Sequence, residues 1–240
     1  MCPNRLSRLH ILALSAGLAL TASPASAGTV VIDIGHSKFE QGSKSATGYG
    51  EFLYNKALAI NVAQYLVQYG HKVDMMNLEG TVKSLAARPA RASELRADLF
   101  LSLHHDSIQP QLMKQRHRYR GYSVWTSGSH PASRQSHICG RTIAASMLQS
   151  GMTPALFHAE KIPGEGHTLL DPNVGHYRRD GLAVLRLSKT PAVLIEAGVI
   201  VNPTEEAYLV SPQVRDSIAR AIATGVLTCL GYGKIEGKRD

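Results

Sequence analysis

Two short apolar runs are the clearest feature of the chain, and each leads into a histidine. Residues 29–34 read TVVIDI and are followed by Gly35 and His36, and residues 98–103 read DLFLSL and are followed by His104. Such short runs, apolar at successive positions, are typical of strands that are covered by helices on both faces of a sheet. We therefore expect two buried strands that end beside a histidine.

Helical patterns separate and follow these runs. Apolar positions recur every three or four residues over 51–69, and Gly70 stands where a left-handed glycine commonly follows a helix. A second helix is predicted over 84–97, although Pro89 falls inside it. A third is expected over 211–230, where a serine and a proline occupy the N-cap and first helical positions.

Four further segments have the composition of strands: 71–76, 121–126, 182–187 and 191–195. Strand and helix alternate, and no linker or repeat divides the chain, which predicts a single α/β domain. We expect a mostly parallel, twisted sheet of about six strands with helices on both faces. Residues 151–180, rich in Gly, Pro and His, fit no regular pattern, and long loops of this kind are often functional.

The beginning of the chain has the pattern of an export signal. Two arginines precede an apolar stretch at 11–22, and the sequence ASA at 25–27 fits a cleavage site. The stretch is shorter than the roughly 20 residues that a membrane span needs. We therefore assign 1–27 to a signal peptide and 28–240 to the catalytic domain. The expected protein is exported, periplasmic or secreted, without a membrane span after cleavage.

The net charge restricts the possible binding partners only slightly, and the cysteine content leaves the presence of a disulfide open. The formal charge of +8 falls to +6 without Arg5 and Arg8, and a basic exported protein is attracted to anionic polymers or membrane surfaces. A nucleic-acid partner is not expected, since no surface motif of interleaved basic and aromatic residues is visible. Cys139 and Cys229 remain after cleavage, and they either form a disulfide or stay two separate buried thiols.

His36, Glu51 and His104 are the candidate metal ligands. The two histidines follow strands, and Glu51 opens the first helix after a glycine-rich loop. Ligand sites in open α/β sheets gather outside the carboxyl ends of the strands, so the three side chains are expected to meet there. Two imidazoles and one carboxylate, with a fourth position left for water, form a catalytic zinc set. The sequence thus predicts a Zn²⁺ site.

Glu196 is the candidate catalytic residue. It follows the apolar run 191–195, where an unpaired buried carboxylate is energetically costly. A carboxylate beside metal-activated water can act as general base and then as acid to the leaving group. The residues alone therefore indicate a zinc-dependent hydrolase.

In combination, these segments resemble the zinc-dependent N-acetylmuramoyl-L-alanine amidases, the cell-wall hydrolases of the amidase 3 type. The similar stretches run from about residue 29 to about residue 230 in the family's order. They are VIDIGH at 31–36, GE at 50–51, the helix and strand over 85–104, GYSV at 121–124, PAVLIEAG at 191–198 and NPTEE at 202–206.

The resemblance implies that His36, Glu51 and His104 bind zinc and that Glu196 is catalytic. The implied substrate is peptidoglycan, cut at the amide between the lactyl group of N-acetylmuramic acid and L-alanine. No inserted helix of the kind that blocks the site in some members is visible, so an activator protein is possible but not implied. We expect a monomer.

The chain departs from the family around both histidines. Ile34 and Ser37 stand where the family usually has proline and glycine, which alters the turn that aims His36. The family commonly has one histidine followed by a small residue and asparagine, whereas this chain has His104-His105-Asp106. The alignment favours His104 as ligand, with His105 as the alternative.

Other readings remain open. A zinc peptidase acting within the stem peptide, or a non-catalytic cell-wall-binding module, could use the same fold. Asp33 is expected to stabilise the turn below His36. Arg186 either binds a substrate carboxylate or forms an ion pair. His167 and His176 are surface residues or contact zinc or substrate, and the basic segment 114–120 is a solvated loop or helps bind the anionic wall.

Overall fold

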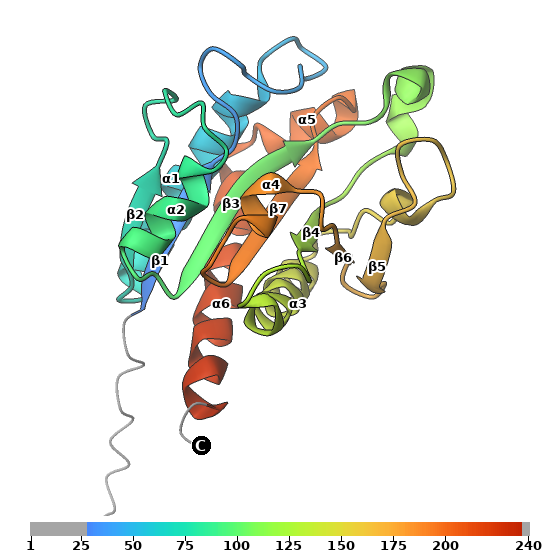
Figure 1. Ribbon diagram of the computed structural model, residues 1–240. Helices are drawn as coiled ribbons and strands as arrows, with labels where there is room; N and C mark the ends of the chain where they lie inside the picture. Colours follow the sequence, from blue (N-terminus) through green and yellow to red (C-terminus); the bar gives the residue numbers. More distant parts are fainter. Residues whose placement is uncertain (1–27, 237–240) are drawn as a thin grey trace, which may run out of the picture.

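The computed structural model describes residues 28–236, so the proposed signal peptide lies outside the described residues. Seven strands form one sheet in the order β2-β1-β3-β7-β4-β6-β5, visible from edge to edge in Figure 1. Their bounds are β1 Thr29–Ile34, β2 Lys72–Met76, β3 Leu99–Asp106, β4 Ser123–Thr126, β5 Thr168–Asp171, β6 His176–Arg178 and β7 Ala192–Val199.

The sheet is parallel in one part and mixed in the other. β1 pairs in parallel with β2 and β3, and β3 with β7. β4 runs antiparallel to β7 and parallel to β6, and β5 closes the edge antiparallel to β6. The predicted α/β class and mostly parallel sheet are confirmed, with seven strands instead of about six.

Helices cover both faces, as expected. α1, α3 and α6 pack on one face, where their apolar side chains join those of Val30, Ile32 and Ile34. α2 and α4 pack on the other face, around Val31 and Phe100. The helices are α1 Glu51–Gln68, α2 Ala87–Glu94, α3 Ser133–Gln149, α4 Ala183–Arg186, α5 Pro203–Leu209 and α6 Pro212–Glu236, with 3₁₀ helices η1 Pro110–Arg118 and η2 Phe157–Ala159.

The alternation of side chains along β3 and β7 determines the face of the sheet from which His104 and Glu196 project. In β3, Leu101 and Leu103 belong to the core under α1, α3 and α6, so His104 projects to the opposite face. In β7, Ile195 belongs to that same core, so Glu196 also projects to the face of α2 and α4. Both polar side chains therefore emerge on one face, near the carboxyl ends of their strands.

One predicted strand is wrong. Residues 182–187 contain the short helix α4 instead, with consecutive Val184 and Leu185 buried and Arg186 and Leu187 exposed. Two consecutive buried positions fit a helical turn, whereas a half-buried strand would alternate. A short apolar run does not distinguish these possibilities by itself.

The helix boundaries follow local signals. Pro89 is the third residue of α2, where the backbone N–H would have no intrahelical acceptor, so the proline removes no helical hydrogen bond. Gly70 follows α1 with φ of +87°, as predicted for a C′ glycine. α6 begins at Pro212, directly after Ser211.

Cys139 of α3 and Cys229 of α6 form a disulfide, with their Cα atoms 4.9 Å apart. Of the two alternatives left by the sequence, the structure therefore contains the bonded one. It joins two helices that lie on the same face of the sheet. None of the described helices is both long and apolar enough to cross a membrane.

Candidate metal centre and neighbouring carboxylate

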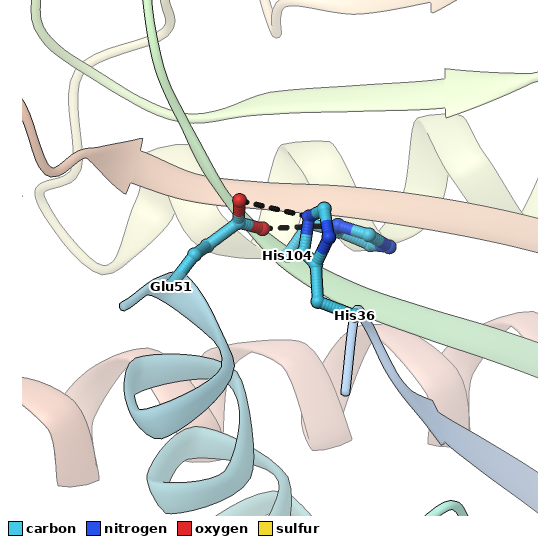
Figure 2. A group of neighbouring side chains, drawn as sticks. All are labelled: His36, Glu51 and His104. Carbon is cyan, nitrogen blue, oxygen red and sulfur yellow. Dashed lines mark hydrogen bonds and ion pairs between the residues drawn. The ribbon is translucent and has the colours of Figure 1, made fainter. Parts of the chain in front are cut away.

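The structure brings His36, Glu51 and His104 together at one end of the sheet. One oxygen of Glu51, Oε2, lies 2.9 Å from Nε2 of His36, and the other, Oε1, lies 3.0 Å from Nδ1 of His104. Figure 2 shows the carboxylate at the start of α1 with both rings turned towards it. One donor atom from each residue lies within 4.8 Å of the other two.

The turn that contains His36 is held by hydrogen bonds from polar side chains to its backbone carbonyls. His36 adopts a left-handed backbone conformation, with φ of 66°. Asn77 donates hydrogen bonds to the carbonyls of Ile34 and His36, at 2.8 and 2.7 Å. Arg88 donates to the same two carbonyls, at 2.7 and 2.5 Å. These four bonds hold a conformation that a non-glycine residue adopts reluctantly.

Asp33 and Ser37 complete the support of this turn. Asp33 is fully buried and accepts hydrogen bonds from Arg88 at 2.7 Å and Ser102 at 2.8 Å. Arg88 is thereby oriented towards the carbonyl of His36, consistent with the expected structural role of Asp33. Ser37 is also buried, and its Oγ accepts the backbone N–H of Glu40 at 2.9 Å. The serine that departs from the family pattern thus closes the turn through its side chain.

Glu51 is held by the loop before it and by the helix that it begins. The backbone N–H of Ser43 points to Oε2 at 3.3 Å, and Asn55, one turn along α1, donates to Oε1 at 3.1 Å. Burial alone would raise the pKa of Glu51, but hydrogen bonds and charge from His104 and His36 outweigh it and hold the pKa well below its ordinary value. The carboxylate is therefore ionised, as a metal ligand must be.

Gly42 leaves the space in which the donors meet. Its φ is +75°, and a Cβ added there would lie 2.5 Å from the His36 ring and 2.6 Å from Oε2 of Glu51. Gly35 has a similar role towards the other histidine, since its Cβ would lie 2.3 Å from the His104 ring. Larger residues would displace the ligands at either position.

His105 faces away from this group. It is buried on the α1 side of β3, where Nδ1 lies 2.8 Å from the side-chain oxygen of Asn55. Burial lowers its pKa to about 4, so the ring is neutral at neutral pH. The geometry therefore places His104, and not the alternative His105, with His36 and Glu51.

This donor set fits zinc. Two imidazole nitrogens and one carboxylate are the three protein ligands of a common catalytic zinc type, which keeps a fourth position open. The donors converge, the carboxylate is ionised, and Asn55 supports Glu51 from behind, as outer hydrogen bonds do in metal sites.

Glu196 lies beside the metal centre. Its Cα is the register partner of the His104 Cα across β3 and β7. Oε2 of Glu196 is buried and has no hydrogen-bond partner among the described residues. Burial, together with the charges of Asp106 and Glu51, raises the pKa of Glu196 well above its ordinary value. Such a carboxylate holds a proton more readily than a solvated one.

A second polar cluster adjoins Glu196, and sequence reasoning missed its centre, His158. This histidine lies between two carboxylates, with Nε2 2.6 Å from Asp106 and Nδ1 2.8 Å from Glu165. Burial opposes protonation, but the charges of and hydrogen bonds to Asp106 and Glu165 raise the pKa of His158 to about 9. His158 comes from the segment 151–180, whose only sequence signal was its richness in Gly, Pro and His.

The other residues singled out from sequence lie elsewhere. His176 is buried against Thr126, with Nε2 2.8 Å from the hydroxyl, and is not part of the donor group. His167 packs edge-on against Trp125, with ring centroids 5.3 Å apart. Arg186 is exposed in α4 and forms no ion pair with the described residues. Most of the basic segment 114–120 is exposed, in and just after η1, which extends beyond the ends of the strands (Figure 1).

Curated proteins and solved structures that are similar to this chain include amidases. The probable cell wall amidase LytH of Staphylococcus aureus is 27% identical over 207 residues, which cover 85% of this chain and 59% of that protein. The chain thus matches about three fifths of the length of these curated relatives.

Among solved structures, the N-acetylmuramyl-L-alanine amidase Ami1 from Mycobacterium smegmatis superposes with a TM-score of 0.72 at 24% identity, over 88% of this chain and 100% of that one. The N-acetylmuramoyl-L-alanine amidase from Clostridium difficile 630 gives a TM-score of 0.68 at 23% identity, over 84% and 96%. These likenesses establish the fold.

The family model Amidase_3, described as N-acetylmuramoyl-L-alanine amidase, matches residues 30–228. That range contains His36, Glu51, His104 and Glu196, together with all seven strands. The chain belongs to this amidase family.

Proposed function

We propose that this chain is a zinc-dependent hydrolase that cleaves the amide between the lactyl group of N-acetylmuramic acid and L-alanine in peptidoglycan. The observation that carries the proposal is the convergence of His36, Glu51 and His104 beside Glu196, whose Oε2 is buried and has no hydrogen-bond partner among the described residues. Membership of the amidase family supports the choice of bond.

Zinc would be held by Nε2 of His36, a carboxylate oxygen of Glu51 and Nδ1 of His104. When bound, it supplies a Lewis acid that lowers the pKa of water and polarises a carbonyl oxygen. The ionised state of Glu51 and the neutral His105–Asn55 pair behind it support the centre from the α1 side.

Glu196 is the proposed general base and acid. Its carboxylate accepts a proton from the attacking water and delivers it to the amide nitrogen as the bond from carbon to nitrogen breaks. The pKa of Glu196, which burial raises above its ordinary value, supports this role, because a carboxylate that binds a proton more tightly is a stronger base. The products are a glycan without its stem peptide and a peptide with a free L-alanine amine.

The proposed place of action is outside the cytoplasm, in the periplasm or in the medium. The Cys139–Cys229 disulfide supports an oxidising compartment, and the export signal read from residues 1–27 agrees with it. Cell-wall relatives such as LytH support the same location. We propose that the chain acts as a monomer; an activator protein is possible but not implied.

Digestion of purified peptidoglycan by the mature protein tests this function. Mass spectrometry should find stem peptides with a free L-alanine amine when zinc is present and none after chelation. Cuts within the stem peptide would establish a peptidase instead. Intact peptidoglycan that nevertheless retains the zinc-loaded protein would establish a binding module.

A further inference from the structure

The loop that precedes Glu51 closes on itself like a small hairpin. Lys44 and Gly50 form an antiparallel bridge, and the backbone N–H of Glu51 donates to the carbonyl of Ser43 at 2.9 Å. The backbone N–H of Ser43 points back to Oε2 of Glu51 at 3.3 Å. The position of the Glu51 carboxylate therefore depends on where this loop lies.

The tip of the loop is bound to the segment that follows β7. The backbone N–H of Ala46 donates to the carbonyl of Ile200 at 2.9 Å. The backbone N–H of Thr47 donates to Oε2 of Glu206 at 2.9 Å, and the Thr47 hydroxyl donates to Oε1 of the same carboxylate. Glu206 lies in α5 and is only 3% exposed. A buried carboxylate from near the end of the chain thus holds a loop from near its beginning.

A second route leads from Glu206 to Glu51 through α1. The hydroxyl of Tyr54 donates to Oε1 of Glu206 at 2.5 Å. The Tyr54 ring contacts the ring of His105, with centroids 5.7 Å apart. Nδ1 of His105 lies 2.8 Å from the side-chain oxygen of Asn55, whose amide donates to Oε1 of Glu51 at 3.1 Å. Both oxygens of the Glu51 carboxylate are therefore connected to contacts that begin at Glu206.

The carboxylate is the chemical group that this position requires. The Thr47 N–H, the Thr47 hydroxyl and the Tyr54 hydroxyl all donate to Glu206, so acceptors are needed at both of its oxygens. Burial opposes ionisation, but hydrogen bonds from Ser45, Thr47 and Tyr54 outweigh it and hold the pKa of Glu206 below its ordinary value. An amide of the same shape would present a donor in place of one acceptor and would lose the charge that strengthens these bonds.

The helix that carries Glu206 continues directly from the strand of the proposed catalytic residue. Glu196 lies in β7, which ends at Val199, and Asn202 then caps α5 by accepting the backbone N–H of Thr204 at 3.0 Å. Glu206 thereby joins the strand that bears Glu196 to the loop and helix that bear Glu51.

We propose that Glu206 is a positioning residue for the metal centre, which anchors the loop before Glu51 and the first turn of α1 and so holds the Glu51 carboxylate where His36 and His104 converge. The inference rests on the proposed zinc amidase function. Glu206 is not one of the converging donors, so it acts through the contacts of Thr47 and Tyr54. Its loss should therefore weaken zinc binding by displacing Glu51.

Zinc dissociation constants, measured by titration calorimetry on metal-free protein, test this role. Glu206→Gln should weaken zinc binding about tenfold, because losses of contacts that support metal ligands cost at least this much. Glu206→Asp keeps the charge and both acceptor oxygens on a shorter side chain, and it should retain part of the affinity. Glu205→Gln is the matched control. The neighbouring Glu205 accepts the backbone N–H of Gly121, at 2.7 and 3.0 Å, and its replacement should leave the zinc constant unchanged.

A double-mutant cycle distinguishes positioning from a general loss of structure. Tyr54→Phe removes one donor to Glu206 and keeps the ring beside His105. It should weaken zinc binding less than Glu206→Gln does and should add little in the Glu206→Gln background, because the two residues share one contact. Thermal unfolding of the metal-free proteins, measured in parallel, reports the effect of each variant on stability.

The following results would overturn the inference. One is a Glu206→Gln protein that binds zinc as tightly as wild type, whatever its stability. Another is an equal loss of zinc affinity in Glu205→Gln, and a third is full additivity of Glu206→Gln and Tyr54→Phe. If Glu206→Gln does not fold, unchanged zinc affinity in Tyr54→Phe decides against the role. Wild-type protein that binds no zinc would instead refute the proposed function, and that result involves no variant.

Discussion

The Cα atoms of His104 and Glu196 are register partners on the neighbouring parallel strands β3 and β7. Paired residues in a sheet project to the same face, so the proposed metal ligand His104 and the carboxylate of Glu196 stand side by side without any loop to place them. The site therefore inherits its rigidity from the centre of the sheet, where β3 lies between β1 and β7.

Replacing Glu196 by glutamine should remove turnover and leave zinc bound. The amide keeps the shape of the side chain but cannot accept the proton of water, and general-base catalysis contributes about 10²- to 10⁴-fold in rate. Product release from peptidoglycan and metal content by atomic absorption are the two measurements. Glu160→Gln, at an exposed position, is the matched control. A Glu196→Gln protein with wild-type rates would remove this residue from the mechanism.

The two adjacent histidines should behave differently towards metal. His104→Ala removes a ligand, so purified protein should contain almost no zinc. His105→Ala removes the partner of Asn55, which holds Glu51, and a ring contact with Tyr54, and losses of such supporting contacts cost about 10- to 100-fold in affinity. Competition with a chromophoric chelator measures both constants. A greater loss of zinc affinity in His105→Ala than in His104→Ala would identify His105 as the ligand.

Gly42→Ala should lower zinc affinity while the fold persists. The added methyl would lie 2.5 Å from the His36 ring, so the ligand must move. Gly48→Ala is a close control, because Gly48 belongs to the same loop and has φ of +90°, with no atom within 4 Å of an added Cβ. Equal zinc affinities in the two variants would mean that strain in the loop, and not the collision with His36, is responsible.

His158 should make stability fall at alkaline pH. Its folded pKa of about 9 exceeds the value of about 6.5 expected in the unfolded chain, so the stabilisation is fully present below pH 6.5 and is lost as pH rises through 9. The shift corresponds to roughly 3 kcal/mol at most. Thermal unfolding between pH 6.5 and 9.5 should show a clear decline in wild type and a flatter profile in His158→Gln. His117→Gln, at an exposed site, should follow the wild type.

Loss of the disulfide should destabilise the protein without changing its zinc site. The bond joins residues separated by 90 positions, and native disulfides that close long loops contribute about 2–5 kcal/mol. Chemical denaturation of a Cys139→Ser/Cys229→Ser variant, compared with oxidised and reduced wild type, measures the effect. Reduced wild type and the double variant should unfold at the same denaturant concentration. A denaturation midpoint equal to that of the oxidised wild type would show that the disulfide does not stabilise the protein.

The sequence was sufficient to predict site residues where a residue with a metal-binding or catalytic side chain directly adjoins a recognisable strand or helix pattern. The apolar run before His36, the run before His104 and the helix opened by Glu51 each carry their own local signal, so the metal ligands could be proposed without a structure. The carboxyl-end rule for α/β sheets then predicted that they meet. Glu196 could be found in the same way, because it follows an apolar strand.

The cluster of Asp106, His158 and Glu165 could not be predicted from the sequence, because it depends on contacts between segments that are distant along the chain. β6 is only three residues long, and its sequence His-Tyr-Arg has no apolar alternation; it is a strand because it pairs with β4. The contact between His158 and Asp106 spans 52 residues and leaves no trace in local composition. The error at 182–187 has a similar origin, since only packing decides how a short apolar run folds.

The reversal of direction between β7 and β4 has a practical consequence for protein engineering. His36, Glu51 and His104 all belong to the parallel part of the sheet or to its helix α1, whereas His158, Glu165 and the β5–β6 hairpin belong to the edge beyond the reversal. Edge hairpins and their loops tolerate exchange better than central strands. Residues 157–178 are thus a natural unit for grafting from related amidases, through which cleavage preferences could be changed while the proposed metal ligands stay in place.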